Sequence, residues 1–188
     1  MATAEKAVEA VRPLDGRSGG VRAAGWIAAT VCSALALARF GFGGDGVVAV
    51  FFVCVLVVVS VVDIERRIIP NRIVLPATAV VLVAHTALAP DRAVEWTAAS
   101  IGAALFLLVP LLVYPAGMGM GDVKLALLLG AGLGRAVVPA FAVAFVAAAI
   151  VGLAIIARGG LAARKTSIPF GPFLAAGGIV ALFSALEP

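Results

Sequence analysis

Seven uncharged, apolar runs make up most of this chain and constrain its fold more than any other feature. They cover approximately residues 23–38, 46–62, 73–90, 96–116, 125–134, 136–157 and 166–186. A helix that crosses the hydrocarbon core of a bilayer needs about 20 residues, with a usable range of about 17–25. Most of the runs reach that length once their flanking residues are included. The sequence therefore predicts an all-α protein, a polytopic membrane helix bundle of about seven transmembrane helices.

The composition agrees with this prediction, since 63% of the 188 residues are hydrophobic and only 13% are charged. A soluble domain averages about 25% charged residues. The net charge of +4 is small, and in a membrane protein it reports topology rather than a nucleic-acid partner. We therefore expect contact with the lipid bilayer and none with nucleic acid.

The basic residues indicate the orientation of the predicted bundle. With seven spans, one side holds 11 of the 14 basic residues, and the other holds only Arg39, Arg92 and Arg135. Because cytoplasmic loops carry an excess of lysine and arginine, the N-terminus is predicted in the cytoplasm and the C-terminus outside. Apart from the N-terminal tail, the carboxylates left at the cytoplasmic boundary are Asp63, Glu65 and Asp122.

The segment Gly117–Lys124, of sequence GMGMGDVK, lies between two apolar runs and places a carboxylate there. An ionisable residue in such a position is costly, and a functional site is the default interpretation. Glycine permits positive φ angles and the close approach of another chain. The segment is therefore predicted to form a tight turn that opens a short helix, with Asp122 in the first turn.

Asp63 is the better candidate for a partner of Asp122. It closes the most apolar run of the chain, whereas Glu65 lies further out beside Arg66 and Arg67, where a solvated ion pair is expected. Two close carboxylates share a proton, so one can act as general base on water and the other as general acid toward a carbonyl. This pair therefore predicts aspartyl-protease chemistry.

The predicted helix ends suggest how the pair divides these roles. Asp122 lies at a helix N-terminus, where the helix dipole favours the anion, and Asp63 lies at a helix C-terminus, where it does not. We expect Asp122 to be ionised and Asp63 to hold the shared proton.

Three segments together resemble the membrane-embedded catalytic domain of bacterial type IV prepilin peptidases, the GxGD aspartyl proteases. These segments are Asp63–Asn71, Gly117–Lys124 with GxGD at Gly119 to Asp122, and Ile168–Leu174 with its Pro-Phe-Gly-Pro sequence. The resemblance implies that Asp63 and Asp122 are catalytic. It also implies supporting roles for the motif residues Gly119, Gly121, Lys124, Pro70 and Asn71.

The resemblance further implies an aspartic endopeptidase in the inner or plasma membrane. Its substrates would be type IV prepilin or pseudopilin precursors, which carry a short basic leader before a hydrophobic helix. Cleavage would occur at the cytoplasmic side of the membrane.

The expected organisation is a polar cytoplasmic tail (1–22), an accessory N-terminal helix (23–45) and a catalytic membrane domain (46–188) with six helices. Larger family members have an N-terminal domain with cysteine pairs and N-methyltransferase activity. Here the two cysteines, Cys32 and Cys54, lie in apolar runs without a CxxC pattern. We expect peptidase activity without methylation, without a cofactor and without a metal.

Two other function classes compete with the protease. A small proton- or cation-coupled transporter could use the same aspartates, although such proteins usually show internal repeats, which are not evident here. A non-catalytic scaffold would leave the two boundary carboxylates unexplained. A presenilin-like protease ranks lower, because no Pro-Ala-Leu segment lies near the C-terminus.

Several other residues have simpler interpretations. His85 is expected to be a packed or hydrogen-bonded core residue, and Trp26 and Trp96 suit interfacial anchoring. Lys124 could position substrate, tune Asp122 or anchor the topology.

Overall fold

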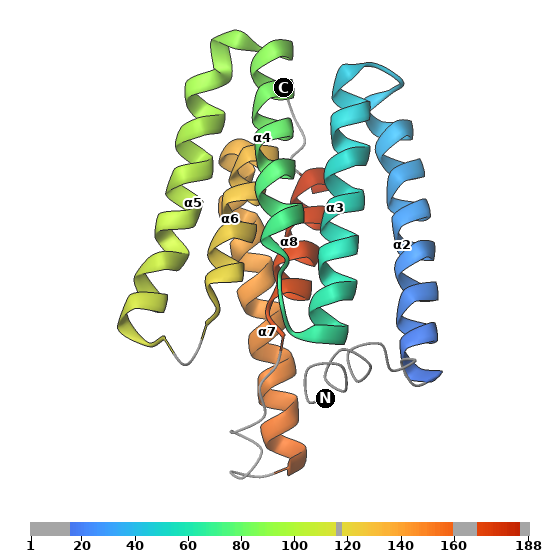
Figure 1. Cartoon of the computed structure of the whole chain (residues 1–188), viewed down its shortest axis with the longest axis vertical. Coiled ribbons are helices and arrows are strands. Elements are labelled where there is room, and N and C mark those ends of the chain that lie inside the picture. Colours follow the sequence, from blue (N-terminus) through green and yellow to red (C-terminus); the bar gives the residue numbers. More distant parts are fainter. Residues whose placement is uncertain (1–15, 116–117, 160–168, 185–188) are drawn as a thin grey trace, which may run out of the picture.

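A computed structural model describes residues 16–115, 118–159 and 169–184 of the chain. These residues form seven α-helices and two short 3-10 helices, η1 and η2. Figure 1 shows how the α-helices are arranged. The all-α prediction is confirmed for this part of the chain. The α-helices are α2 (Gly16–Phe40), α3 (Gly44–Arg66), α4 (Asn71–Leu88), α5 (Ala93–Val113), α6 (Met120–Leu133), α7 (Val137–Gly159) and α8 (Gly171–Ser184).

The helices have the length and hydropathy of membrane spans. Five helical segments within the described residues are long and apolar enough to cross a membrane, and one of them, Met120–Arg158, contains both α6 and α7. The helix α8 is apolar but shorter. The chain is a multi-pass membrane protein, and the count of seven spans remains a prediction.

The short helix α6 lies at the centre of the bundle. Its residues Leu125, Leu128 and Leu129 are completely buried, and the helix packs against α4, α5 and α8. A helix that is apolar on every side is stable when other helices or lipid cover it, and here other helices cover α6. This central position explains how a helix of 14 residues belongs to a membrane bundle in which α2, α3, α4, α5 and α7 are longer.

Glycine allows α6 to approach α5 closely. A Cβ atom at Gly130 would collide with the backbone of α5 at Ala99 and Ser100. Small residues permit such a close approach between membrane helices. Gly134, four residues further on, lies in η2 (Gly134–Ala136), with a positive φ of 55° and Trp96 beside it. The two glycines therefore serve different purposes.

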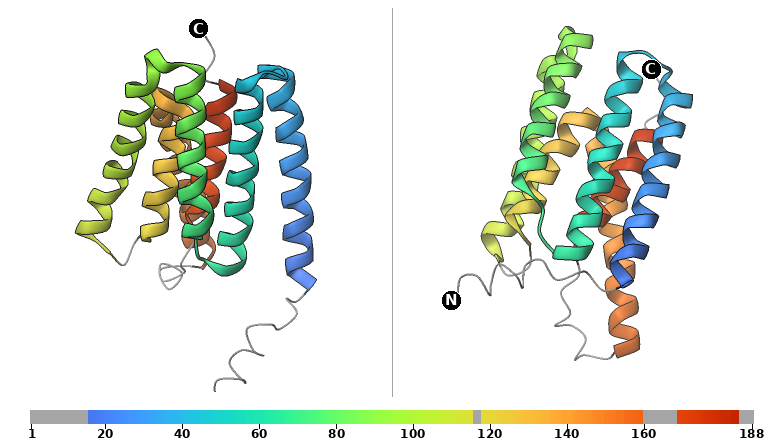
Figure 2. Two further views of the ribbon diagram at one scale, coloured as in Figure 1. Left: turned by 45° about the horizontal axis from the view of Figure 1, so that its top comes forward. Right: turned by 45° about the vertical axis from the view of Figure 1, so that its right-hand side comes forward.

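The helix α2 lies at the edge of the bundle against α3, as both views in Figure 2 show. Gly25 faces Val61 so closely that a Cβ atom there would lie 2.5 Å from Val61 Cγ2. Further along the same interface, Ser33 Oγ lies 3.4 Å from Cys54 Sγ. The predicted accessory helix is thus present and packed, while the division of the chain into domains stays a prediction.

The prolines lie both inside helices and at their starts. Pro76 and Pro110 lie inside α4 and α5, whereas Pro139 is the third residue of α7. In the first turn the backbone N–H that proline lacks would have no helical partner anyway, so Pro139 needs no kink. Pro70 immediately precedes α4, where it is the N-cap residue rather than part of the first turn.

Candidate active site

The first aspartate of the candidate site is held in the last turn of α3. Asp63 is 5% exposed. The helix ends because Arg67 adopts a left-handed conformation with φ of 54°, and its N–H donates to the Asp63 carbonyl oxygen at 2.8 Å. The chain then continues through Ile68 and Ile69 to Pro70, and α4 begins at Asn71. The end of one apolar helix thus places a carboxylate inside the protein.

The second aspartate lies in the first turn of α6, as the sequence predicts. Asp122 is the third residue of that helix and 8% exposed. Its Oδ2 atom accepts a hydrogen bond from the backbone N–H of Gly119 at 3.2 Å. An acidic residue at this position satisfies an N–H group that the helix itself leaves unpaired.

Both aspartates line one pocket of about 520 Å³. The remaining walls come from the turn between α3 and α4, the start of α6 and the segment before α8: Arg67, Ile68, Ile69, Asn71, Met118, Gly119, Met120, Gly121, Lys124, Pro169 and Phe170. The fold therefore brings the two predicted partners, Asp63 and Asp122, to one pocket although they are 59 positions apart in the sequence. Among the described residues, no group of three histidine, cysteine, aspartate or glutamate side chains could hold a metal ion.

A third element, the start of α8, completes the site. The backbone N–H of Gly171 donates to Asp63 Oδ2 at 3.0 Å in a buried position. Sequence reasoning did not assign this role to Gly171, although the Pro-Phe-Gly-Pro segment that contains it was the available signal. Asp63 therefore lies between the C-terminus of α3 and the N-terminus of α8, whereas Asp122 lies at the N-terminus of α6. The dipoles of α3 and α8 act on Asp63 in opposite senses, and the expected division of roles between the aspartates stays a prediction.

The glycines beside Asp122 do not adopt backbone angles that only glycine can adopt, and what matters at Gly121 is the missing side chain. Gly119 has φ of −91° and ψ of 151°, an extended conformation open to any residue. A Cβ atom at Gly121 would lie 2.7 Å from Ile69 Cβ, so this glycine lets α6 begin directly against the turn after α3. Gly117 lies outside the described residues.

The last two supporting residues contact each other beside the pocket. Lys124 Nζ donates to Asn71 Oδ1 at 2.9 Å, which links the first turns of α6 and α4. The structure thus gives Lys124 a partner across the site. It brings together all of the predicted supporting residues except Pro70, which precedes Asn71 but does not line the pocket.

Glu65 does not form the predicted ion pair with Arg66 or Arg67. Its carboxylate instead pairs with Arg22 of α2, with 2.8 Å between Arg22 Nε and Glu65 Oε1 and 3.2 Å between Nη2 and Oε2. The Glu65 side chain is only 8% exposed. The prediction was wrong because Glu65 faces the neighbouring helix rather than solvent.

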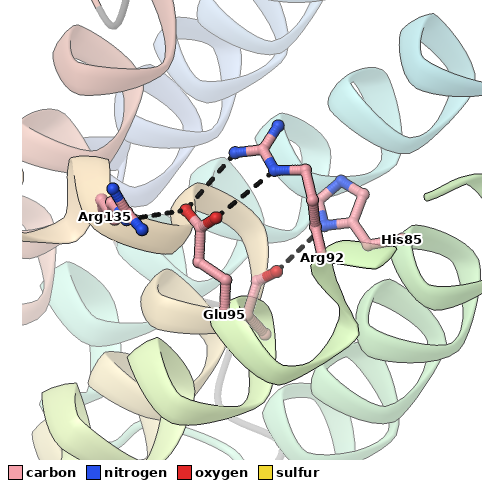
Figure 3. Close-up of polar contacts among 5 residues, drawn as sticks. His85, Arg92, Glu95 and Arg135 are labelled. Atoms are coloured by element: carbon pink, nitrogen blue, oxygen red, sulfur yellow. Dashed lines mark hydrogen bonds and ion pairs between the residues drawn. The ribbon is translucent and has the colours of Figure 1, made fainter. Parts of the chain in front are cut away.

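The opposite end of the bundle carries a separate polar cluster, drawn in Figure 3. His85 Nδ1 lies 3.0 Å from the Ala131 carbonyl oxygen, and its ring lies 4.3 Å from that of Trp96. Glu95 pairs with both Arg92 and Arg135. The prediction that His85 is a packed, hydrogen-bonded residue is confirmed. Trp96 packs on His85 with its Nε1 atom buried, and its role as an interfacial anchor stays a prediction.

Comparison with known proteins places this geometry in a family. The sequence model of the type IV leader peptidase family matches residues 50–156, which include both aspartates. The chain belongs to the type IV leader peptidase family. This membership confirms the resemblance seen in the sequence, and it leaves the transporter hypothesis without support.

Several curated relatives of this family are similar to the chain. A prepilin leader peptidase/N-methyltransferase of Bacillus subtilis (strain 168) is 36% identical over 147 residues, which are 76% of this chain and 58% of that protein. A protein of the same name from Burkholderia pseudomallei is 36% identical over 166 residues, 84% of this chain and 52% of that protein. The chain therefore spans about half the length of the curated relatives it matches. No solved structure matches it significantly.

Proposed function

We propose that this protein is an aspartic endopeptidase that removes the short basic leader from type IV prepilin-like precursors. The observation that carries the proposal is the shared pocket: Asp63 and Asp122 are both buried and line the same space. Family membership supports the reaction class, and the names of the relatives support the choice of substrate.

In the proposed reaction the two aspartates share one proton. The ionised carboxylate takes a proton from a water molecule, whose oxygen attacks the carbonyl carbon of the scissile peptide bond. The protonated carboxylic acid donates its proton to the carbonyl oxygen. Collapse of the tetrahedral intermediate breaks the C–N bond. The departing nitrogen takes up the proton that the first carboxylate removed from water, and a hydroxyl group of the intermediate returns a proton to the second carboxylate, which restores the pair. The hydrogen bonds from Gly119 and Gly171 hold one oxygen of each carboxylate, and no other hydrogen bond among the described residues occupies the second oxygen.

The proposed location of the site is the cytoplasmic side of the inner membrane, with the N-terminus in the cytoplasm and the C-terminus outside. The charge distribution supports it. The end of the bundle that carries the aspartates also carries Arg66, Arg67, Arg72 and Lys124, whereas Arg39, Arg92 and Arg135 lie toward the other end. A basic excess marks cytoplasmic ends of membrane proteins. The proposed partners are the precursor and the bilayer.

A co-expression cleavage assay tests the proposal. A pilin-like precursor from the same source is expressed with the wild-type chain, Asp63→Asn or Asp122→Asn, and its mass is measured. We expect cleavage by wild type and none by either variant. Asp45→Asn is the matched control, because Asp45 is exposed at the opposite end of the same helix α3.

Two results would contradict the proposal. Cleavage that survives both substitutions would remove the aspartate mechanism. Loss of cleavage with Asp45→Asn would show that any aspartate substitution in α3 disrupts the protein, so that loss of cleavage would not identify a catalytic carboxylate. Membrane levels of all forms are measured in parallel, so that only correctly inserted protein is compared.

A further inference from the structure

An apolar groove of about 850 Å³ runs between α5 and α7 on the surface of the bundle. The two helices both contact α6, and the short η2 connects α6 to α7 at one end of the groove. The residues of the groove are almost all apolar: Val94, Ala98, Ala99, Gly102, Ala103, Phe106, Val137, Val138, Phe141, Ala142 and Phe145, with Glu95, Gly134 and Arg135 at one end. We refer to it as the α5–α7 groove.

The two walls of this groove differ in side-chain size. The middle of the α5 wall is built from small residues, namely Ala98, Ala99, Gly102 and Ala103. A Cβ atom added at Gly102 would meet nothing within 4 Å. The α7 wall carries Val138 and Phe145, which are 70% and 37% exposed. Small residues at a spacing of four on a membrane helix let the backbone of another helix approach closely. Here α5 presents that pattern, Ala98-xxx-Gly102, to open space.

A line of aromatic side chains connects this groove to the aspartate pocket. The rings of Phe106 and Phe141 stack with 5.5 Å between their centroids, and Phe141 and Phe145 follow at 6.3 Å. Phe145 lies 5.5 Å from Phe170, which lines the pocket of Asp63 and Asp122. The groove therefore ends where the proposed reaction takes place.

We propose that the α5–α7 groove docks the hydrophobic helix that follows the leader in the precursor. The inference rests on the proposed function, because that reaction needs the start of a membrane helix next to the aspartates. From Val94 to Phe106 the α5 wall extends roughly 18 Å at 1.5 Å per residue, enough for about three turns of a docked helix. The leader then leaves the membrane on the side of the aspartate pocket.

The other apolar groove of the bundle suits this helix less well. It lies between α2 and α3, and its lining includes Arg22 and Glu65. These two side chains pair across it at 2.8 Å, so an ion pair bridges one end. That ion pair lies at the end of α3 that carries Asp63, where the leader would have to leave. In the α5–α7 groove the pair between Glu95 and Arg135 lies instead at the end away from the aspartates.

Photo-cross-linking tests the occupant directly. Benzoylphenylalanine is placed at Val138, which lines the groove, or at Ile101, which is 51% exposed on α5 but lies outside it. Each form is co-expressed with the precursor, irradiated in membranes and analysed by mass. We expect the Val138 form, and not the Ile101 form, to capture the hydrophobic helix of the precursor or product. Capture of only lipid or of a second copy of this chain, no capture at all, or equal capture from Ile101 would overturn the proposal.

Cleavage kinetics give a second, independent test. Gly102→Leu places a large side chain in the groove at a position where an added Cβ atom meets nothing within 4 Å, and Ile101→Phe adds bulk one residue away on the outside. We expect Gly102→Leu to raise KM about tenfold, equivalent to about 1.4 kcal/mol, with little change in kcat, while Ile101→Phe behaves like wild type. Wild-type kinetics for Gly102→Leu would overturn the docking site. Cross-linking from Val138 without cleavage by wild type would instead keep the groove and refute the proposed function.

Discussion

The N–H group of Gly171 donates to the carboxylate of Asp63 at 3.0 Å, although the two residues are 108 positions apart. Asp63 lies in the last turn of helix α3 and Gly171 begins helix α8. The position of one proposed catalytic carboxylate therefore depends on the docking of the last described helix. Three elements, the end of α3, the start of α6 and the start of α8, must be assembled together before the pocket exists.

We predict that Gly171→Ala abolishes most cleavage while the protein remains in the membrane. The new Cβ atom would lie 2.7 Å from Asp63 Oδ2 and 3.3 Å from Ile69 Cδ1, so the carboxylate must move. A displacement of about 1 Å at a reacting group can reduce a rate about 100-fold. The measurement is the rate of precursor cleavage per inserted enzyme.

The control for this variant is Gly152→Ala in α7, where a Cβ atom meets nothing within 4 Å. It should cleave like wild type. Full activity of Gly171→Ala would mean that the N-terminus of α8 does not set the position of Asp63.

The contact between Lys124 and Asn71 gives a second prediction, on coupling between helices. Their hydrogen bond of 2.9 Å links the first turns of α6 and α4 beside the aspartates. We expect Lys124→Met and Asn71→Ala each to slow cleavage roughly two- to fivefold, the size of one hydrogen bond in a largely solvated position. The double variant should be no slower than the worse single variant, because both remove the same bond.

A complete double-mutant cycle of cleavage rates measures this coupling. Additive losses would show that Lys124 and Asn71 act separately, with Lys124 contacting the substrate or anchoring the topology instead.

The sequence predicted best those features that depend on neighbouring residues. The first turn of α6 follows from glycine before an acidic residue and an apolar run, and Asp122 lies where that pattern predicts. The end of α3 near Asp63 follows in the same way from the polar residues and Pro70 after the long apolar run. Asp63 was chosen over Glu65 as the partner of Asp122 only because it lies closer to the apolar run of the same helix. In the structure Asp63 lines one pocket with Asp122.

Features that depend on packing between distant helices were not predictable in this way. The pairing of Glu65 with Arg22 requires knowing that α2 lies beside α3, and local spacing favoured Arg66 and Arg67 instead. The bond from Gly171 to Asp63 likewise requires the docked position of α8. A single sequence carries no direct signal for such contacts, although the Pro-Phe-Gly-Pro segment marked the right place.

The ion pair between Arg22 and Glu65 leads to a third prediction, on stability. Arg22→Ala leaves the Glu65 carboxylate, whose side chain is 8% exposed, without its cation, whereas Glu65→Gln removes the buried charge itself. Leaving a buried charge without a partner destabilises a protein more than removing that charge. Arg22→Ala should therefore lower the thermal midpoint of the purified protein more than Glu65→Gln. Arg39→Ala, at the exposed far end of α2, should leave the midpoint unchanged. A larger loss for Glu65→Gln than for Arg22→Ala would contradict this order.

The fourth prediction compares two glycines on facing helices, Gly130 of α6 and Gly102 of α5. A Cβ atom at Gly130 would collide with the α5 backbone at Ala99 and Ser100, and backbone atoms cannot rotate away. We expect Gly130→Ala to push α5 from α6 and to destabilise the protein by about 1–3 kcal/mol, the usual cost of overpacking. Gly102→Ala places the same methyl group in open space, and its better helix propensity should leave stability unchanged or slightly higher.

The measurement is the free energy of unfolding of both variants and wild type in the same detergent, together with cleavage. Asp122 lies in the first turn of α6, and Gly130 lies further along the same helix, where it contacts α5. If Gly130→Ala shifts α6, Asp122 should therefore move relative to Asp63, and cleavage should be slower. Equal stability of the two variants would mean that the close contact between α5 and α6 is not fixed by Gly130. A stable but inactive Gly130→Ala variant would show that α6 can move without unfolding the bundle, and that activity depends on its position more strictly than stability does.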